Sequence, residues 1–107
     1  MNTDRELLET AAKAANFTVT WAGDNPPYPR ATLDGHWNPT WNPLENDGDA
    51  LRLAVKLEID LCFGANYVIA DGVQQPTVNN ANDPYLAVRY AIVRAAAELA
   101  PPAVGAV

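Results

Sequence analysis

Two Trp-Asn-Pro units stand close together in residues 37–43, and their side chains are well suited to hold a small ligand. An asparagine before a proline is driven toward extended backbone, in which alternate side chains point to the same side. The two indoles would then form a wall that can stack a nucleobase, while the amides behind it can bind ribose hydroxyls. The ligand contacts predicted from this pattern are Trp37, Asn38, Trp41 and Asn42. In the alternative interpretation, the indoles only lock a long loop over the sheet edge and the second helix.

A second candidate is an arginine on the last predicted helix. When residues 84–99 are placed on a helical wheel, Arg89 falls inside an apolar arc that covers more than half of the circumference. A guanidinium stays charged, so it must meet an acid, carbonyls, a partner subunit or an anionic ligand. We predict that Arg89 binds the phosphate of a nucleotide as a forked donor, helped by Arg94. The alternative for Arg89 is an internal ion pair with one of four acids: Asp47, Asp49, Asp60 or Asp83. For Arg94 it is a solvated pair with Glu98, four residues further on.

Residues that could carry a reaction are few. His36 is the only histidine, and Cys62 is the only cysteine, so neither a zinc site nor a Cys-His pair is supported by spacing. Asp47 and Asp49 flank Gly48, but their place at the start of a predicted helix explains them as capping acids. We therefore expect no metal, no cofactor and no catalysis. A small phosphohydrolase that uses His36 with one of these acids is the less favoured alternative.

Composition limits the classes of protein that remain. The chain has 107 residues, of which 49% are hydrophobic, and this suits one domain over residues 1–107. The formal net charge of -6 makes a nucleic acid polymer an unfavourable partner. A single cysteine cannot form an intramolecular disulfide, which fits a reducing compartment. No apolar run approaches the roughly 18 residues of a membrane span, and the first ten residues lack the blocks of a signal peptide. We expect a cytoplasmic protein with no membrane partner.

The elements that must position these side chains follow from periodicity and capping signals. Asn46 is a suitable cap for the second helix, and Asp83 followed by proline suits the start of the last one. Two long segments, 22–43 and 73–82, are rich in proline and asparagine and are predicted to be irregular. The predicted order is a helix over about 4–15, a strand over 17–21, a helix after 46, a hairpin over 58–70 with its turn at 64–66, and a helix over about 84–99. This order predicts an α+β fold: three helices packed on a small antiparallel sheet of two to three strands, with a long Pro/Asn-rich loop.

Two segments carry a family resemblance. WNPLENDGDALRLAVKL (41–57) and DPYLAVRYAIVRAAAEL (83–99) resemble small uncharacterised phage-encoded proteins related to the NinX-like family. Those proteins carry a W-N-P-L-x-D-D-G-D-A-L-R-L-A-V-K-L segment and a closing D-P-Y-A-A-x-R-x-A-I-V-R-A-A-A-E helix. This chain departs from the pattern at Asn46, where the first acid would stand, and by an additional Trp-Asn-Pro upstream.

The resemblance implies a phage accessory protein made in the bacterial cytoplasm. Phages use small sponge proteins of this kind to sequester nucleotide immune signals, such as the cyclic ADP-ribose isomers of Thoeris or the cyclic dinucleotides of CBASS. By this analogy we expect a non-catalytic protein that binds such a nucleotide and thereby blocks host defence signalling. We also expect a homo-oligomer, because alanine-rich faces on the first and last helices permit close packing between subunits. The rival interpretation is a protein-interaction module that inhibits a host enzyme through its acidic surface.

Overall fold

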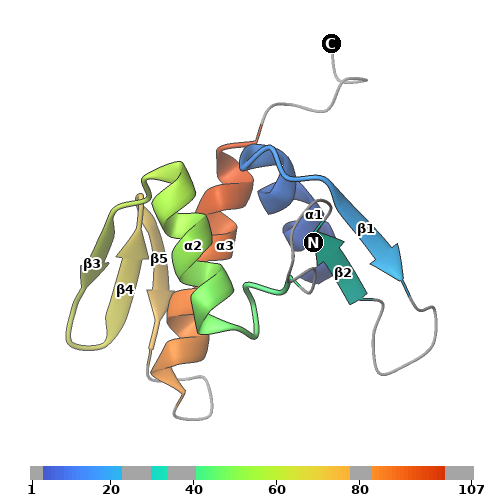
Figure 1. The fold of residues 1–107 in the computed structure, drawn as a ribbon. Coiled ribbons are helices and arrows are strands. Elements are labelled where there is room, and N and C mark those ends of the chain that lie inside the picture. Colours follow the sequence, from blue (N-terminus) through green and yellow to red (C-terminus); the bar gives the residue numbers. More distant parts are fainter. Residues whose placement is uncertain (1–3, 23–29, 34–40, 78–82, 101–107) are drawn as a thin grey trace.

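A computed structural model describes residues 4–22, 30–33, 41–77 and 83–100 (Figure 1). This part of the chain contains three helices, a two-stranded hairpin and a three-stranded antiparallel sheet. Their bounds are α1 Asp4–Ala14, β1 Val19–Ala22, β2 Arg30–Leu33, α2 Asp47–Leu57, β3 Leu61–Phe63, β4 Tyr67–Ala70, β5 Val73–Pro76 and α3 Pro84–Glu98. The α+β arrangement predicted from the sequence is confirmed.

Helix α3 is the central element. The sheet β3-β4-β5 packs against it, α1 and α2 also pack against it, and the hairpin β1-β2 lies at the far end of the molecule from the sheet (Figure 1). None of the described helices is long and apolar enough to cross a membrane.

The helix boundaries follow from their caps. Asn46 accepts a hydrogen bond from the backbone N–H of Asp49 at 2.9 Å, and Asp83 accepts one from the N–H of Leu86 at 3.1 Å. Each satisfies a donor that the first helical turn leaves without a partner. Helix α2 ends where Glu58 adopts a left-handed conformation with φ 54°. Local sequence therefore determines the start of both helices, as predicted.

Two segments predicted to be irregular contain strands. Strand β2 lies inside residues 22–43 and pairs with β1, from Val19 opposite Leu33 to Ala22 opposite Arg30. Strand β5 lies inside residues 73–82 and completes the second sheet by pairing with β4. These two predictions were wrong because proline and asparagine content alone does not exclude a short strand at a sheet edge.

The turn between β4 and β5 carried a signal that explains this pairing. Asp71 and Gly72 have φ values of 48° and 86°, which are the positive values required at both central residues of a tight type I′ hairpin turn. Asp71 also accepts a hydrogen bond from the N–H of Asp60 at 2.9 Å, which fixes the turn to the start of β3. The Asp-Gly pair therefore indicates a hairpin turn from β4 into a further strand, and not the end of the sheet.

The alanine-rich faces of α1 and α3 pack inside one chain. Ala11 and Ala12 on the first helix and Ala91 and Ala95 on the last are almost completely buried, and the two helices are in contact. Small side chains let the two backbones approach closely. These faces are therefore occupied within the chain, so an intersubunit contact would need another surface.

Candidate functional site

The indole of Trp41 lies in the hydrophobic core and is 3% exposed. Its ring meets that of Phe17 edge to face, with 6.1 Å between centroids and 83° between planes. A buried indole holds the segment before α2 onto the helices, as the alternative interpretation of this residue expects. Trp37 and Asn38, the other half of the predicted wall, lie outside the described residues, and so does His36.

Asn42 organises the turn that leads into α2. Its side-chain oxygen accepts a hydrogen bond from the N–H of Leu44 at 3.1 Å, and its own N–H donates to the carboxylate of Asp49 at 2.9 Å. Pro43, next to it, is completely buried. Asp49 is itself buried and also accepts from Arg52 at 2.7 Å. The amide predicted to bind ribose is thus used within the chain, as a local asparagine turn.

Arg89 ties three elements together near the start of α3. Its Nε donates to the carbonyl of Leu44 at 2.9 Å, and Nη1 donates to the carboxylate of Asp47 at 2.6 Å. Asp83 lies 3.9 Å from Nη2. The arginine side chain is only 13% exposed, whereas that of Asp47 is 68% exposed. Both acids belong to the four named for the internal ion pair, so the guanidinium holds the loop before α2 onto α3.

Arg94 points toward the sheet. Its Nη1 donates to the side-chain oxygen of Gln75 on β5 at 2.7 Å. This bond joins α3 to β5, the strand that was not predicted from the sequence. It explains the position of the Arg94 side chain without a contact to Glu98. Arg89 lines the groove between α2, α3 and the β3-β4 hairpin, whereas Arg94 is not among its lining residues.

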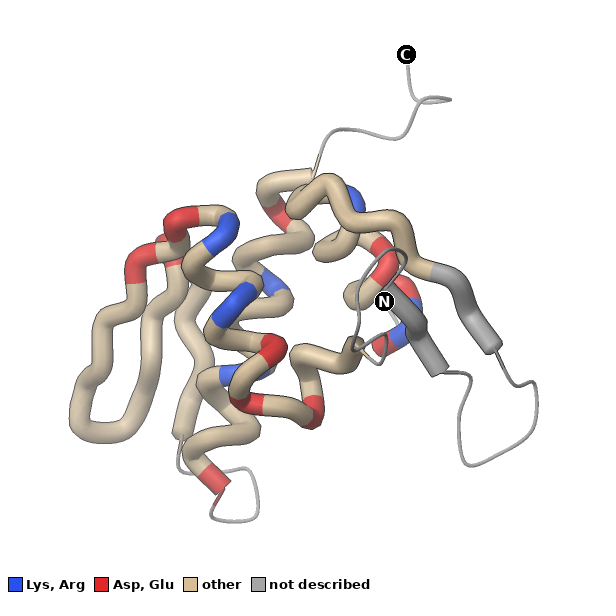
Figure 2. The backbone as a smooth tube through the Cα atoms, viewed as in Figure 1, with Lys and Arg blue, Asp and Glu red and all other residues tan. Residues whose placement is uncertain are grey.

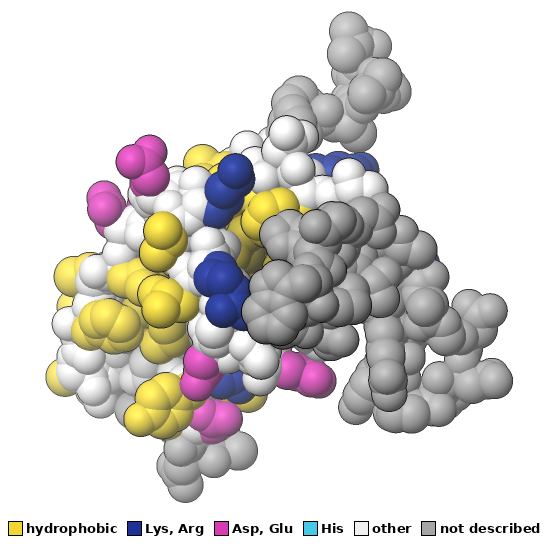
Figure 3. All heavy atoms as spheres, viewed as in Figure 1, with side chains coloured by type: hydrophobic (Ala, Val, Ile, Leu, Met, Phe, Trp, Pro, Cys, Tyr) yellow, Lys and Arg dark blue, Asp and Glu magenta, His cyan; other side chains and the backbone are white. Residues whose placement is uncertain are grey.

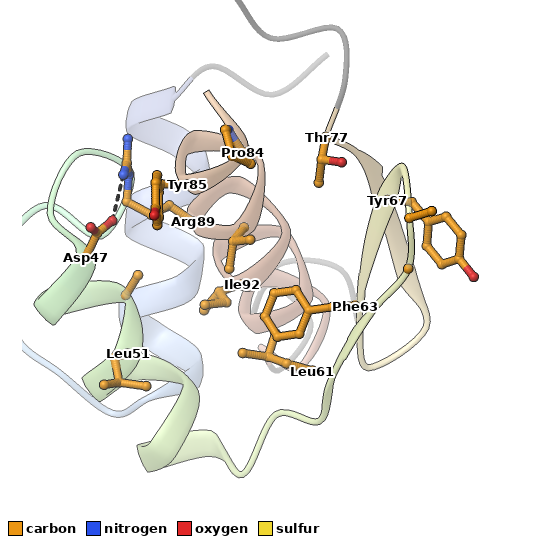
Figure 4. A pocket seen from close by; sticks show the side chains of 14 residues that line it. Asp47, Leu51, Leu61, Phe63, Tyr67, Thr77, Pro84, Tyr85, Arg89 and Ile92 are labelled. Atoms are coloured by element: carbon orange, nitrogen blue, oxygen red, sulfur yellow. Dashed lines mark hydrogen bonds and ion pairs between the residues drawn. The ribbon is translucent and has the colours of Figure 1, made fainter. Parts of the chain in front are cut away.

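A groove opens between α2, the first turns of α3 and the β3-β4 hairpin, and its volume is about 640 Å³ (Figure 4). Sites for small ligands usually measure roughly 300–1,000 Å³. Leu51, Phe63 and Tyr85 point into it and are strongly exposed, at 59%, 65% and 67%. The apolar lining consists mainly of Leu51, Leu61, Phe63, Tyr85, Val88 and Ile92.

The walls of the groove have a clear origin in the sheet register. Leu61 pairs with Ala70 and Phe63 with Val68, so both β3 side chains lie on the sheet face that carries the buried residues of β4. Helix α3 covers this face at β4 and β5, while β3 extends past it (Figure 1). Phe63 therefore faces the helices and yet remains exposed.

Among the described residues, the charged side chains that line the groove are Asp47 and Arg89. Asp47 and Arg89 stand at the α2 end, joined by their ion pair (Figure 4). The ring of Tyr67 turns away from the groove and covers Gly64, where any side chain would collide with it. The interior thus offers flat aromatic and aliphatic surface, with one ion pair as the charged contact.

The described part of the chain holds no group of three or more His, Cys, Asp or Glu side chains that could bind a metal ion. Asp47 and Asp49, considered as acids for a reaction, lie in the first turn of α2, where Asp47 bonds to Arg89 and Asp49 bonds to Asn42 and Arg52. The described residues that line the groove include no His, Cys or Ser side chain.

Comparison with protein-family models, with curated proteins and with solved structures found no match. The relation to the NinX-like proteins therefore stays a prediction. The groove residues Leu51, Phe63 and Tyr85 were not singled out from the sequence. One signal was available: the apolar arc of residues 46–57 is wider than the face that a helix packed on one side needs.

Proposed function

We propose that the protein is a non-catalytic binding protein whose groove takes up a small nucleotide-type ligand. The observation that supports this most is the set of exposed side chains Leu51, Phe63 and Tyr85 around a groove of ligand size. A nucleobase between the Phe63 and Tyr85 rings would bury apolar surface on both sides, and base–aromatic stacking contributes about 1–3 kcal/mol per base.

Arg89 gives the anionic part of such a ligand a contact at the rim. Its hydrogen bonds to Leu44 and Asp47 use only part of its N–H donors. The acids Asp47 and Asp83 beside it reduce its attraction for a phosphate, because two negative charges surround one positive charge. We therefore expect the base to supply more of the affinity than the phosphate does.

The biological role that we propose for this binding is the sequestration of a nucleotide immune signal in infected bacteria. The signal would be of the cyclic ADP-ribose or cyclic dinucleotide class. A sponge needs affinity and no turnover, and the mainly apolar lining of the described groove suits the binding of a base. The phage setting rests on the sequence resemblance alone.

Titration calorimetry against a panel of cyclic ADP-ribose isomers, cyclic dinucleotides and simple nucleosides tests the proposal. We expect binding at micromolar concentrations, with loss of at least tenfold in affinity for Tyr85→Ala and a smaller loss for Leu51→Ala. Val55→Ala is the matched control, because Val55 is an exposed aliphatic residue one turn further along α2 that does not line the groove. Absence of heat across the whole panel at about 100 μM protein would refute nucleotide binding.

Recovery of the ligand separates binding from turnover. After incubation and heat denaturation, a binding protein returns the nucleotide intact, whereas a phosphohydrolase returns a product. Chromatography of the supernatant distinguishes the two outcomes, and a product peak would revive the minority hypothesis based on His36.

The same exposed side chains favour a second candidate, a protein-interaction module. Leu51, Phe63 and Tyr85 form an apolar surface beside acids on a chain of net charge -6, which suits a partner with apolar and basic side chains. A pulldown from host lysate that recovers one stoichiometric protein, and that Leu51→Ala weakens, would favour this function over nucleotide binding.

A further inference from the structure

Strand β3 forms a free edge of the three-stranded sheet. In the order β3-β4-β5 it pairs only with β4, and no described strand lies on its other side (Figure 1). The N–H of Gly64 donates to Tyr67 and the N–H of Asp71 donates to Asp60, both at 2.9 Å, so residues 60 and 64 face β4. Hydrogen bonds alternate along an antiparallel strand. Leu61 and Phe63 therefore direct their backbone N–H and C=O groups outward.

This edge lacks the features that usually prevent pairing with another chain. Exposed edges commonly carry charges, prolines or bulges. Strand β3 has the sequence Leu-Cys-Phe and has none of these. The opposite edge, β5, ends at Pro76, and its Gln75 is bonded to Arg94 of the central helix. The two edges of one sheet thus differ, and β3 is the one open to a further strand.

We propose that β3 pairs with β3 of a second copy of the chain, antiparallel, about a two-fold axis at Cys62. The two three-stranded sheets would become one continuous sheet. In this register Leu61 lies opposite Phe63 of the second copy, and the pair exchanges the outward N–H and C=O groups. Cys62 lies opposite Cys62 of the second copy. This is a pair without hydrogen bonds, in which the Cα atoms come to about 4.5 Å.

The register is compatible with the charges that flank the strand. Asp60 would lie opposite Gly64 of the second copy and Glu58 opposite Asn66, so no acid faces an acid. The same axis makes the two α2 helices antiparallel. Helix α2 carries acids in its first turn and a lysine in its last, and Figure 2 shows this separation along the helix. The acidic first turns of the two α2 helices would then lie at opposite ends of the pair.

The exposed apolar area suits a dimer of moderate strength. Leu51, Phe63 and Tyr85 lie on the same face, over α2, β3 and the start of α3, where Figure 3 shows hydrophobic side chains gathered. At the exposures given above they present roughly 400 Å² together. A standard interface buries about 800 Å² on each partner, part of which the paired strand backbones would provide. We expect a dissociation constant in the micromolar range, reached without any ligand.

The dimer would also change the groove. Because Leu61 and Phe63 form its β3 wall, the same two residues of the second copy would continue this wall across the two-fold axis. The effect of this longer wall on ligand binding rests on the proposed function. The dimer itself does not, so it is tested without ligand.

Sedimentation equilibrium over about 1–100 μM tests the association. We expect the mass to rise with concentration toward twice the 11.5 kDa of one chain. Cys62→Lys places two lysines against each other at the axis and should raise the dissociation constant at least tenfold. Gln74→Lys is the matched control, because Gln74 is exposed on the same sheet face but on the opposite edge strand, and it should leave the dimer unchanged. A monomer at all concentrations, or a dimer that Cys62→Lys leaves intact, would overturn the proposal.

Thiol cross-linking tests the register. Diamide, as the oxidant, accepts the two electrons and two protons released when two Cys62 thiols join in a disulfide. The paired chains hold these residues at a separation that suits a disulfide, so we expect covalent dimer within minutes, at a rate that does not fall on dilution within the dimeric range. A Cys62→Ser/Gln74→Cys variant keeps one exposed thiol on the same face and should cross-link only by random collision. Equal cross-linking rates for the two proteins would overturn the proposed pairing.

Discussion

Replacement of Arg89 by methionine distinguishes a structural role, in which the guanidinium holds Leu44 and Asp47, from a role in ligand binding alone. Methionine keeps most of the apolar stem and removes the guanidinium. The carbonyl of Leu44, a residue that is 5% exposed, then loses the Nε hydrogen bond. A buried acceptor left without a partner costs about 1–3 kcal/mol. The ion pair with Asp47 adds little, since that carboxylate is mostly exposed and such pairs contribute about 0–1 kcal/mol.

We therefore expect Arg89→Met to lower the free energy of unfolding by about 1.5–3 kcal/mol, and Asp47→Asn by less than about 1 kcal/mol. Urea denaturation at pH 7, in low and high salt, measures both. The loss in Asp47→Asn should shrink in high salt, because exposed charges are screened, whereas the loss in Arg89→Met should persist.

Equal losses in the two variants, or a loss in Arg89→Met that salt removes, would refute the claim that the bond to Leu44 dominates. A stable Arg89→Met protein would show that the guanidinium has no structural role. That result would favour the ligand contact over the internal ion pair, the two roles that the sequence left open for Arg89.

Two further predictions concern the helices. Glu58→Gly should raise the free energy of unfolding by about 0.5–1 kcal/mol, because Glu58 holds a left-handed conformation that glycine adopts without strain. Thermal denaturation measures the gain. Glu45→Gly is the control, because Glu45 is an exposed loop residue without a positive φ, and it should not increase the stability. The hydrogen bond that Tyr90 donates to Asp4, followed by burial, raises the pKa of Tyr90 above its ordinary 10.0. Its tie between α1 and α3 is thus fully present below pH 10 and is lost as the pH rises through the raised pKa. Asp4→Asn should lower this pKa in a phenolate absorbance titration referenced to Tyr90→Phe, and an unchanged titration would contradict the assignment.

The sequence predicted the helices well because their starts are determined locally. Asn46 and Asp83 each bond to a backbone N–H three residues further on, so a short stretch of sequence contains the whole interaction. Strands β2 and β5 were missed for a related reason. Their stability comes from pairing with β1 and β4, respectively. For the pairing of β4 with β5, the Asp71-Gly72 turn was a local sign.

The candidate site was less accessible to sequence reasoning. The helical wheel found Arg89, but the choice among four acids depends on how α2 and α3 cross, which periodicity does not contain. The extended wall of indoles assumed that backbone alternation continues through the second Trp-Asn-Pro. Instead, Asn42 bends the chain into a turn, and Trp41 enters the core. The groove itself needs α2 and β3 to be placed relative to each other, which only the tertiary fold does.

Arg89, which was chosen from the sequence as a ligand contact, also helps to hold the walls of the groove in place. Arg89 lies one helical turn after Tyr85, on the same side of α3, and its bonds to Leu44 and Asp47 fix the distance between α3 and the start of α2. Leu51 stands one turn further along α2, on the same side as Asp47. The ion pair therefore sets the distance between Tyr85, on which a base would stack, and Leu51 in the α2 wall of the groove. If the proposed binding is correct, Asp47→Asn should weaken the binding of an uncharged nucleoside, measured by calorimetry, without unfolding the chain. The substitution loosens this separation and leaves the core untouched, and the loss of a negative charge beside Arg89 does not act on a ligand without phosphate.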